Sequence, residues 1–247
     1  MSIAKNLFLI IVIAIMVLTP STAYAHKLIP TDGSNISIDS SLEITDPRIS
    51  WAMYEEINGD IRYYSFYGKQ GESLYASIVI PKLENLIEFT PSIAFIGVES
   101  HLDLIEEFKI LKPKKSFDFS LPQGYDVYVF DYEGIIPSKE FYEPFGQVTY
   151  WERQEINFDF PVDGTYYLAI FDEKSNSGKY ALAVGTIEDF SMYDFFTILP
   201  YAWFETKIFF EDYLTVTVSM VIVIAIFSAT VYGIFRITRK IITRMRT

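Results

Sequence analysis

The stretch GTYYLAIF at residues 164–171, followed after a polar turn by KYALAVG at residues 179–185, decides the class of fold. Both runs are rich in aromatic and aliphatic residues, and large apolar side chains recur at every second position. A period of two is the spacing at which side chains share one face of a β-strand. The turn contains Asn176, Ser177 and Gly178, so the two runs are predicted to form a β-hairpin.

Runs of the same kind recur through the middle of the chain, at 62–67, 73–80, 92–98, 125–130 and 154–160. A glycine-bearing turn (GKQG) separates the first two runs, which are therefore predicted to form a second hairpin. Several short strands at regular spacing, together with 18 Tyr and 21 Phe, favour a mainly β fold, an antiparallel β-sandwich. Only the run HLDLIEEFKIL at 101–111 predicts a short helix.

Residues 1–25 have the pattern of a secretory signal peptide. One cation, Lys5, precedes an uncharged apolar run at 7–18, and the segment ends in Ala-Tyr-Ala. Twelve apolar residues are few for a membrane span, whereas the small-x-small ending fits a cleavage site after Ala25. Cleavage there would make His26 the mature N-terminus. The alternative interpretation is an uncleaved N-terminal anchor.

The other end of the chain predicts a transmembrane helix over residues 213–235. This run of 23 residues carries no charge, and about 34 Å of helix is enough to cross a hydrocarbon core of about 30 Å. The tail at 236–247 is basic and contains no acid. Its cations, which predict a cytoplasmic C-terminus, are Arg236, Arg239, Lys240, Arg244 and Arg246. The sequence thus predicts a single-pass protein of the cell membrane with residues 26–186 as an outer domain.

The net charge of −12 is divided unevenly along the chain. Residues 26–212 contain all 32 acids and 14 of the 20 Lys and Arg, a net −18, whereas the tail carries +5. So acidic an outer part argues against nucleic acid and anionic lipid as its ligands. The chain has no cysteine, so the outer domain must rest on its hydrophobic core.

Two segments of this chain resemble a known family. The runs YYSF, KQGE and LYASI between residues 63 and 78 look like the early hairpin of the bacterial pre-peptidase C-terminal domains, and 164–170 with 178–184 looks like their closing hairpin. The resemblance covers 44–185 and implies a jelly-roll-like β-sandwich used for adhesion or substrate contact, in some members with calcium. Residues 109–150 are longer than that family needs. The whole layout also resembles uncharacterised membrane-anchored surface proteins of archaea and bacteria, which implies a location but no activity.

Residues 187–212 form an aromatic segment between the predicted sandwich and the predicted membrane helix. Aromatic rings are common where a protein meets the membrane–water interface, so we expect a helix lying in that interface. The residues predicted to contact the interface are Phe195, Phe196, Trp203, Phe204, Phe209 and Phe210. Pro200 is expected to kink or divide this helix. The alternative is a final strand and linker that belong to the sandwich.

Copper and calcium are the two metals that the sequence brings into consideration. After cleavage, the α-amino group and imidazole of His26 could join His101 in a copper-binding histidine brace like that of lytic polysaccharide monooxygenases, since Cu(II) suits nitrogen-rich sites. The alternative is that both histidines are ordinary solvated residues. Calcium prefers several oxygen ligands. The carboxylates that cluster for it are Asp32, Asp39, Glu43 and Asp46 near the start, and Asp163, Asp172 and Glu173 around the last strand pair.

Other signals are weaker. Asn35-Ile36-Ser37 is an N-glycosylation sequon in a polar segment. Trp51, Trp151 and Trp203 could form a sugar platform, although core or interface positions are more usual for such residues.

No phosphate loop, nucleophile elbow or thiol chemistry is found. The sequence therefore predicts a non-catalytic protein that binds or adheres outside the cell, or an accessory subunit of a membrane complex. Its predicted partners are the lipid bilayer together with either an extracellular ligand or a membrane protein. A copper-dependent redox or carrier protein using His26 and His101 is the alternative.

Overall fold

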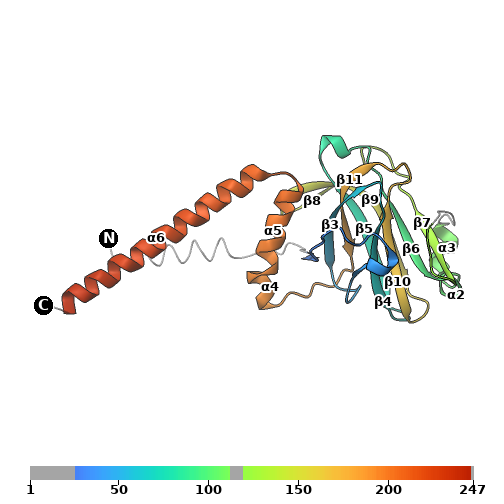
Figure 1. Cartoon of the computed structure of the whole chain (residues 1–247), viewed down its shortest axis with the longest axis horizontal. Coiled ribbons are helices and arrows are strands. Elements are labelled where there is room, and N and C mark those ends of the chain that lie inside the picture. The colour runs from blue at the N-terminus through green and yellow to red at the C-terminus, as the bar shows by residue number, and fades with distance from the viewer. Residues whose placement is uncertain (1–25, 112–118, 246–247) are drawn as a thin grey trace. The chain divides into compact units, whose positions relative to one another are not determined.

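The computed structural model describes residues 26–111 and 119–245 (Figure 1). The chain divides into two compact units, one ending at Ser191 and the other running from Met192 to Thr247, and each is considered by itself. The predicted signal peptide at 1–25 lies outside the described residues, as does Arg246 of the predicted basic tail.

The first unit contains two β-sheets. In spatial order, the six-stranded sheet consists of β1 (Lys27–Leu28), β3 (Trp51–Asn58), β11 (Ser177–Val184), β5 (Ser73–Pro81), β9 (Val148–Asp159) and β8 (Glu140–Glu143). The five-stranded sheet consists of β2 (Leu42–Glu43), β4 (Arg62–Gly68), β10 (Gly164–Phe171), β6 (Ser92–Val98) and β7 (Tyr125–Phe130). The short helices of this unit are η1 (Ile38–Ser40), η2 (Glu84–Leu86), α2 (Glu99–Leu102) and α3 (Glu106–Leu111).

Alternate side chains of both sheets meet in one core. Those with no exposed surface include Met53, Ile78 and Leu182 from the six-stranded sheet and Ile93, Phe95 and Leu168 from the five-stranded sheet. The ring of Phe95 packs edge-on against Phe158 at 4.8 Å between centroids and stacks on Tyr166 at 5.4 Å. Burying one such side chain contributes about 1.5–3 kcal/mol, so this shared core holds the layers together. The prediction of a mainly β fold is confirmed, and two sheets over one core are consistent with the predicted β-sandwich.

The outer face of the five-stranded sheet is also buried. Ala94, Ile96, Val129 and Ala169 form a second apolar cluster, covered by Phe119. Strands buried on both faces carry continuous apolar runs instead of alternating ones. This explains the sequence SIAFIGV of β6, in which six of seven residues are buried.

Both predicted hairpins are wrong. β4 pairs with β10 in the five-stranded sheet, whereas β5 pairs with β11 in the six-stranded sheet. The connections at 69–72 and 172–176 therefore cross from one layer to the other. Four extended residues span up to about 13 Å, and packed sheets lie about 10 Å apart, so either partner was within reach.

The sheets are also not purely antiparallel. β1 runs parallel to β3, and β2 runs parallel to β4, each over two residues. The helix predicted at 101–111 is two short helices, α2 and α3, interrupted at 103–105. The jelly-roll-like strand order implied by the family resemblance stays a prediction.

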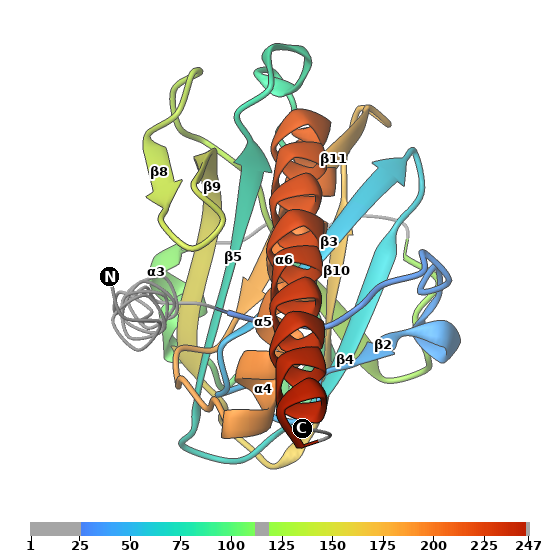
Figure 2. The same ribbon diagram turned by 90° about the vertical axis from the view of Figure 1, so that its left-hand side faces the viewer.

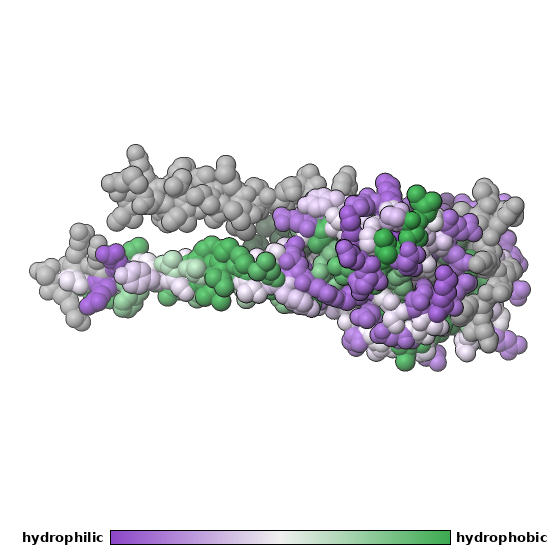
Figure 3. All heavy atoms as spheres, turned by 90° about the horizontal axis from the view of Figure 1, so that it is seen from above, coloured by the Kyte–Doolittle hydropathy of each residue, from purple (hydrophilic) through white to green (hydrophobic). Residues whose placement is uncertain are grey.

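The second unit is helical and comprises α4 (Met192–Phe196), α5 (Ile198–Phe209) and α6 (Tyr213–Met245). Pro200 lies in the first turn of α5, where its missing N–H costs no helical hydrogen bond, and the chain breaks instead at Thr197. α6 contains 27 predominantly apolar residues, Tyr213–Arg239, long enough to cross a membrane. Figure 3 shows these residues as an apolar band along the helix, followed by hydrophilic residues toward the C-terminus. A C-terminal apolar helix of membrane-spanning length is thereby confirmed.

Asp212 begins α6. Its carboxylate accepts a hydrogen bond from the backbone N–H of Thr215 at 3.2 Å and pairs with Lys207 Nζ at the same distance. A hydrogen bond from the Thr215 side chain is the main reason that the pKa of Asp212 is lowered, and the backbone bond of Thr215 and Lys207 add to it. An acid at this position caps the helix and interacts favourably with its dipole.

Candidate functional site

A recess lies at the end of the six-stranded sheet where β3 begins and β11 ends. It has a volume of about 400 Å³, within the range of about 300–1,000 Å³ typical of small-molecule sites. Four chain segments contribute its lining, which consists of Arg48, Glu72, Ser73, Tyr75, Asn157, Gly185, Thr186 and Ile187.

The segment that follows β11 is fixed against the segment that precedes β3. The N–H groups of Thr186 and Ile187 both donate to Arg48 O at 2.9 Å, and Ser50 N–H donates to Ile187 O at 2.9 Å. Gly185 makes this close approach possible, because a Cβ there would lie 2.2 Å from Ile49 O and the residue has φ +75°. One wall of the recess is therefore backbone held in a defined position.

Arg48 is the charged centre of the recess. Its Nε and Nη2 donate to the carboxylate of Asp46 at 3.0 and 2.7 Å, and Nη1 pairs with Glu72 Oε1 at 3.0 Å. The bonds from Arg48 hold the pKa of Asp46 below its usual value, and the same bonds raise the pKa of Arg48. Two carboxylates face one guanidinium, so a further anion would meet net negative charge here.

Uncharged groups complete the lining. The phenol of Tyr75 donates to Glu155 at 3.4 Å, and burial raises its pKa. Asn157, its neighbour across the β5–β9 pair, is exposed and offers an amide that both donates and accepts. The hydroxyl of Ser73 donates to Asp159 at 2.5 Å. An aromatic ring beside several planar polar groups is an arrangement suited to binding a polar molecule.

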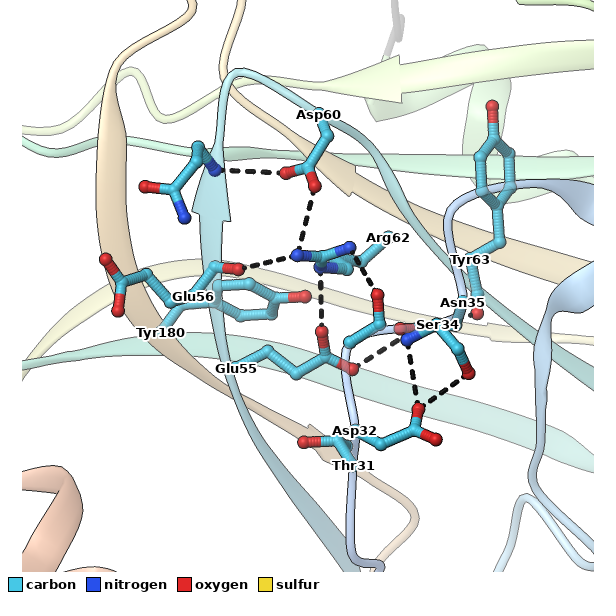
Figure 4. A network of polar contacts seen from close by, with 12 residues as sticks. Thr31, Asp32, Ser34, Asn35, Glu55, Glu56, Asp60, Arg62, Tyr63 and Tyr180 are labelled. Carbon is cyan, nitrogen blue, oxygen red and sulfur yellow. Dashed lines mark hydrogen bonds and ion pairs between the residues drawn. The ribbon is translucent and has the colours of Figure 1, made fainter.

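A second polar cluster is buried around Arg62 at the start of β4 and Glu55 of β3 (Figure 4). Arg62 Nε pairs with Glu55 Oε2 at 2.9 Å, Nη2 pairs with Asp60 at 3.0 Å, and Nη1 donates to Gly33 O at 2.9 Å. The side chains of Arg62 and Glu55 are 9% and 2% exposed. Burial raises the pKa of Glu55 despite the neighbouring cation. This cluster ties the N-terminal segment to the β3–β4 turn and leaves little room for a ligand.

Asn35, the predicted glycosylation site, belongs to this buried cluster. Its Nδ2 donates to Glu55 Oε1 at 3.0 Å and to Tyr63 O at 3.3 Å, and only 4% of the residue is exposed. A glycan on this nitrogen would have to be attached before folding and would remove at least one of the two hydrogen bonds, because it replaces one of the two amide hydrogens.

The structure does not bring His26 and His101 together. His26 precedes β1, and its Nδ1 lies 2.6 Å from the hydroxyl of Ser50, beside the six-stranded sheet. His101 lies in α2 against the ring of Tyr166, 6.3 Å away, in the five-stranded sheet. Figure 1 shows β3, the partner of β1, and α2 on opposite sides of the sandwich. The histidine brace is therefore not formed.

The acids considered for calcium make separate local contacts. Asp32 accepts from Ser34, Asp46 binds Arg48, and Asp163 accepts from Gln70 N–H at 2.7 Å. Asp172 accepts the N–H groups of the turn between β10 and β11. Within residues 26–111 and 119–245, no three His, Asp or Glu residues are grouped as a metal site would require.

The aromatic residues occupy varied positions. Trp151 is buried in the core, and Trp51 Nε1 donates to Asp46 O at 2.9 Å. Of the predicted interface residues, Phe196 is 76% exposed, and Phe195 and Phe204 are each 39% exposed. Trp203 and Phe209 lie in α5, and Phe210 follows it. Arg236, Arg239, Lys240 and Arg244 all lie in the C-terminal part of α6.

Comparisons with known proteins give weak likenesses. A scan against protein-family models finds no match, and a search of the curated proteins finds none. Among solved structures, the chain is similar to the pre-peptidase C-terminal domain of a collagenase from Bacillus anthracis, with 16% identity over 57% of this chain and 91% of that domain and a TM-score of 0.28.

Two copper-binding proteins are also similar. One is CorA, a surface-associated protein of Methylomicrobium album BG8, with 9% identity over 68% of this chain and all of that chain and a TM-score of 0.29. The other is MopE, a secreted protein of Methylococcus capsulatus, with 9% identity over 50% of this chain and 69% of that chain and a TM-score of 0.20. At TM-scores of 0.20–0.29, these likenesses carry no argument about the fold of this chain, and nothing about their ligands transfers to it.

Proposed function

We propose that this protein is a membrane-anchored binding protein whose extracytoplasmic β-sandwich takes a neutral polar ligand, a small saccharide, in the recess beside Arg48. The observation that carries the proposal is the recess itself. It combines a backbone wall at Gly185, the half-buried ring of Tyr75 and the amide of Asn157 around a guanidinium whose charge is already balanced.

The chemistry of the lining favours a polyhydroxylated ligand. Hydroxyl groups both donate and accept, as do Asn157 and Thr186, and a sugar ring can pack on an aromatic face. Anionic ligands are disfavoured by Asp46 and Glu72 beside Arg48 and by the net −18 of residues 26–212.

The proposed topology places the sandwich outside and the C-terminus in the cytoplasm. Five cations within the last 12 residues support this orientation, because basic flanks of membrane helices stay on the cytoplasmic side. Copper binding by His26 with His101 is not part of the proposal, since His26 contacts Ser50 beside the six-stranded sheet whereas His101 packs against Tyr166 of the five-stranded sheet.

A glycan array probed with the full chain in lipid nanodiscs tests the ligand class and the site. We expect the wild type to retain one or a few neutral saccharides. Asn157→Trp, which fills the recess from an exposed position, should abolish that binding. Asn85→Trp, at an exposed position in η2, is the matched control and should bind normally. An array without any bound saccharide would refute the ligand class, and binding unchanged by Asn157→Trp would refute the site.

Cysteine labelling tests the topology, because the natural chain has no thiol. Tyr67→Cys, at a residue of β4 that is 52% exposed, should react with a membrane-impermeant maleimide on intact cells. Thr243→Cys in α6 should react only after the cells are permeabilised. The opposite pattern would overturn the proposed orientation.

A further inference from the structure

β8 is the open edge of the six-stranded sheet. Figure 2 shows it at the margin, with β9 as its neighbour on one side. It pairs antiparallel with β9, so that Phe141 lies opposite Tyr150 and Tyr142 lies opposite Thr149. An exposed edge presents unpaired backbone groups and can template pairing with another strand.

The direction of each backbone group in β8 follows from one bond. Glu152 N–H donates to Lys139 O at 2.9 Å, so Lys139 and Glu152 form a hydrogen-bonded pair. Hydrogen-bonded and non-hydrogen-bonded pairs alternate along an antiparallel ladder. Phe141 therefore bonds toward β9, whereas the N–H and C=O groups of Glu140 and Tyr142 point away from the sheet.

The side chains of this edge are apolar at its centre. Phe141 is 40% exposed and stacks on Tyr150, and Tyr142 is 57% exposed. β8 contains no proline or lysine, which proteins commonly use to block edge pairing. Glu140 is neutralised by Lys82 at 2.6 Å, and the carboxylate of Glu143 accepts the N–H groups of the following turn.

We propose that β8 pairs with β8 of a second copy of this chain, antiparallel and about a two-fold axis at Phe141. Glu140 then lies opposite Tyr142 of the second copy, and the reverse pair follows by symmetry. Each pair exchanges two backbone hydrogen bonds through the groups that point outward. The two six-stranded sheets become one continuous sheet.

The sequence selects this register. On one face Phe141 meets its own symmetry mate, and aromatic cross-strand pairs are favourable. On the other face Glu140 meets a tyrosine, so no like charges oppose each other. Shifting the copies by two residues in one direction places Glu140 opposite Glu140. Shifting them in the other direction places it opposite Pro144, which has no N–H. A second copy thus fits this edge in a single register.

The pairing is expected to be reversible and to depend on the number of chains per membrane area, because a strand of four residues buries little surface. Confining the chains to one bilayer would raise their effective concentration. The dimer does not require the recess ligand, so a failure of either proposal leaves the other one unaffected.

Disulfide crosslinking of the full chain in lipid vesicles tests the pairing. A non-hydrogen-bonded antiparallel pair has a Cα separation of about 4.5 Å, inside the range of about 4.4–6.8 Å that a disulfide needs. Phe141→Cys should therefore form a covalent dimer under mild oxidation, at least fivefold more than Tyr67→Cys on the other sheet. Equal yields from the two variants would overturn the proposal.

A second pair of variants leaves Phe141 in place. Copies carrying Glu140→Cys should crosslink to copies carrying Tyr142→Cys, and neither should crosslink to itself. Adding Tyr142→Pro to Phe141→Cys removes an outward N–H without touching the β8–β9 ladder, and should lower the dimer yield at least fivefold. Tyr142→Phe is the control and should keep it. Crosslinking that survives the proline would refute edge pairing as the cause.

Discussion

Replacing Arg62 by alanine should be among the most destabilising single changes in the sandwich. Arg62 pairs with Glu55 at 2.9 Å and Asp60 at 3.0 Å, and it donates to the carbonyl oxygens of Gly33 and Glu56 at 2.9 and 3.1 Å. Its removal leaves the buried carboxylate of Glu55 without a cation. Breaking a buried pair from one side costs about 3–5 kcal/mol. The exposed half of the interaction, with Asp60, adds little to this loss.

Thermal unfolding of the full chain, followed by near-UV circular dichroism, measures the effect. For a domain of this size about 2–4 °C of Tm corresponds to 1 kcal/mol, so Tm should fall by about 6–20 °C. Arg48→Ala, which removes a pair at the surface, is the control and should shift Tm much less. A fall no larger than that of the control would refute the reasoning.

A double-mutant cycle isolates the contribution of the charge interaction between Arg62 and Glu55 to the free energy of unfolding. In the Glu55→Gln background the buried group is neutral, so Arg62→Ala should cost less there, by about 1–3 kcal/mol. Strict additivity of the two changes would show that the loss comes from packing and from the bond to Gly33.

Three other results are expected. Gly185→Ala should destabilise the sandwich by more than about 2 kcal/mol, because the new Cβ would meet Ile49 O. Gly71→Ala, at φ +78° in open space, should cost only about 1 kcal/mol of backbone strain. Equal losses of the two variants in urea unfolding would contradict this expectation. Burial raises the pKa of Glu55, so on acidification the folded state binds a proton at this carboxylate before the unfolded state does. The stability of the wild type relative to Glu55→Gln should therefore rise as pH falls from 7 toward 4.5. An opposite slope would mean that the charge of Arg62 outweighs burial in setting the pKa of Glu55. Arg153→Met should speed hydrogen exchange in the β5–β6 loop, whose carbonyl oxygens Arg153 binds; unchanged exchange would count against that role.

The sequence was a good guide to which residues form strands and a poor guide to their partners. The alternation of Tyr166, Leu168 and Ile170 identifies the core face of β10, yet it is equally compatible with pairing to β11 or to β4. Pairing is decided by how the two layers close over one core, which depends on residues far apart in the chain. Both hairpin predictions failed for this reason.

β3 was missed because of its acids. Glu55 and Glu56 stand where an apolar pattern was expected, and a buried Glu55 becomes acceptable only through Arg62 and Asn35. That compensation is a property of the fold, since Asn35 reaches β3 from a separate segment. The same burial is why a sequon in a polar stretch proved to be an inaccessible amide.

The recess also lay beyond the reach of the sequence. Arg48, Tyr75, Asn157 and Gly185 come from four segments and share no motif. The one local signal was Gly185 at the end of a strand, which indicates a tight backbone approach without saying what it approaches. The two histidines show the converse, because residue types suited to a metal were present and the topology held them apart.

The attachment of the segment after β11 also determines how the domain would respond to mechanical force. A protein anchored through its C-terminal helix is pulled at that end whenever its outer part is held. The load would reach the domain through Asp189, which forms an ion pair with Lys27, and through Phe190, whose ring lies beneath the same ammonium group. It would also pass through Ile187, which forms a parallel bridge with Ile49. A force along two parallel neighbouring segments loads the contacts between them at the same time, so these contacts must break together before a strand can separate from the sheet. Under the proposed anchoring through α6, a load applied at the C-terminal end of the domain is therefore shared by β1 and β3 as well as by β11.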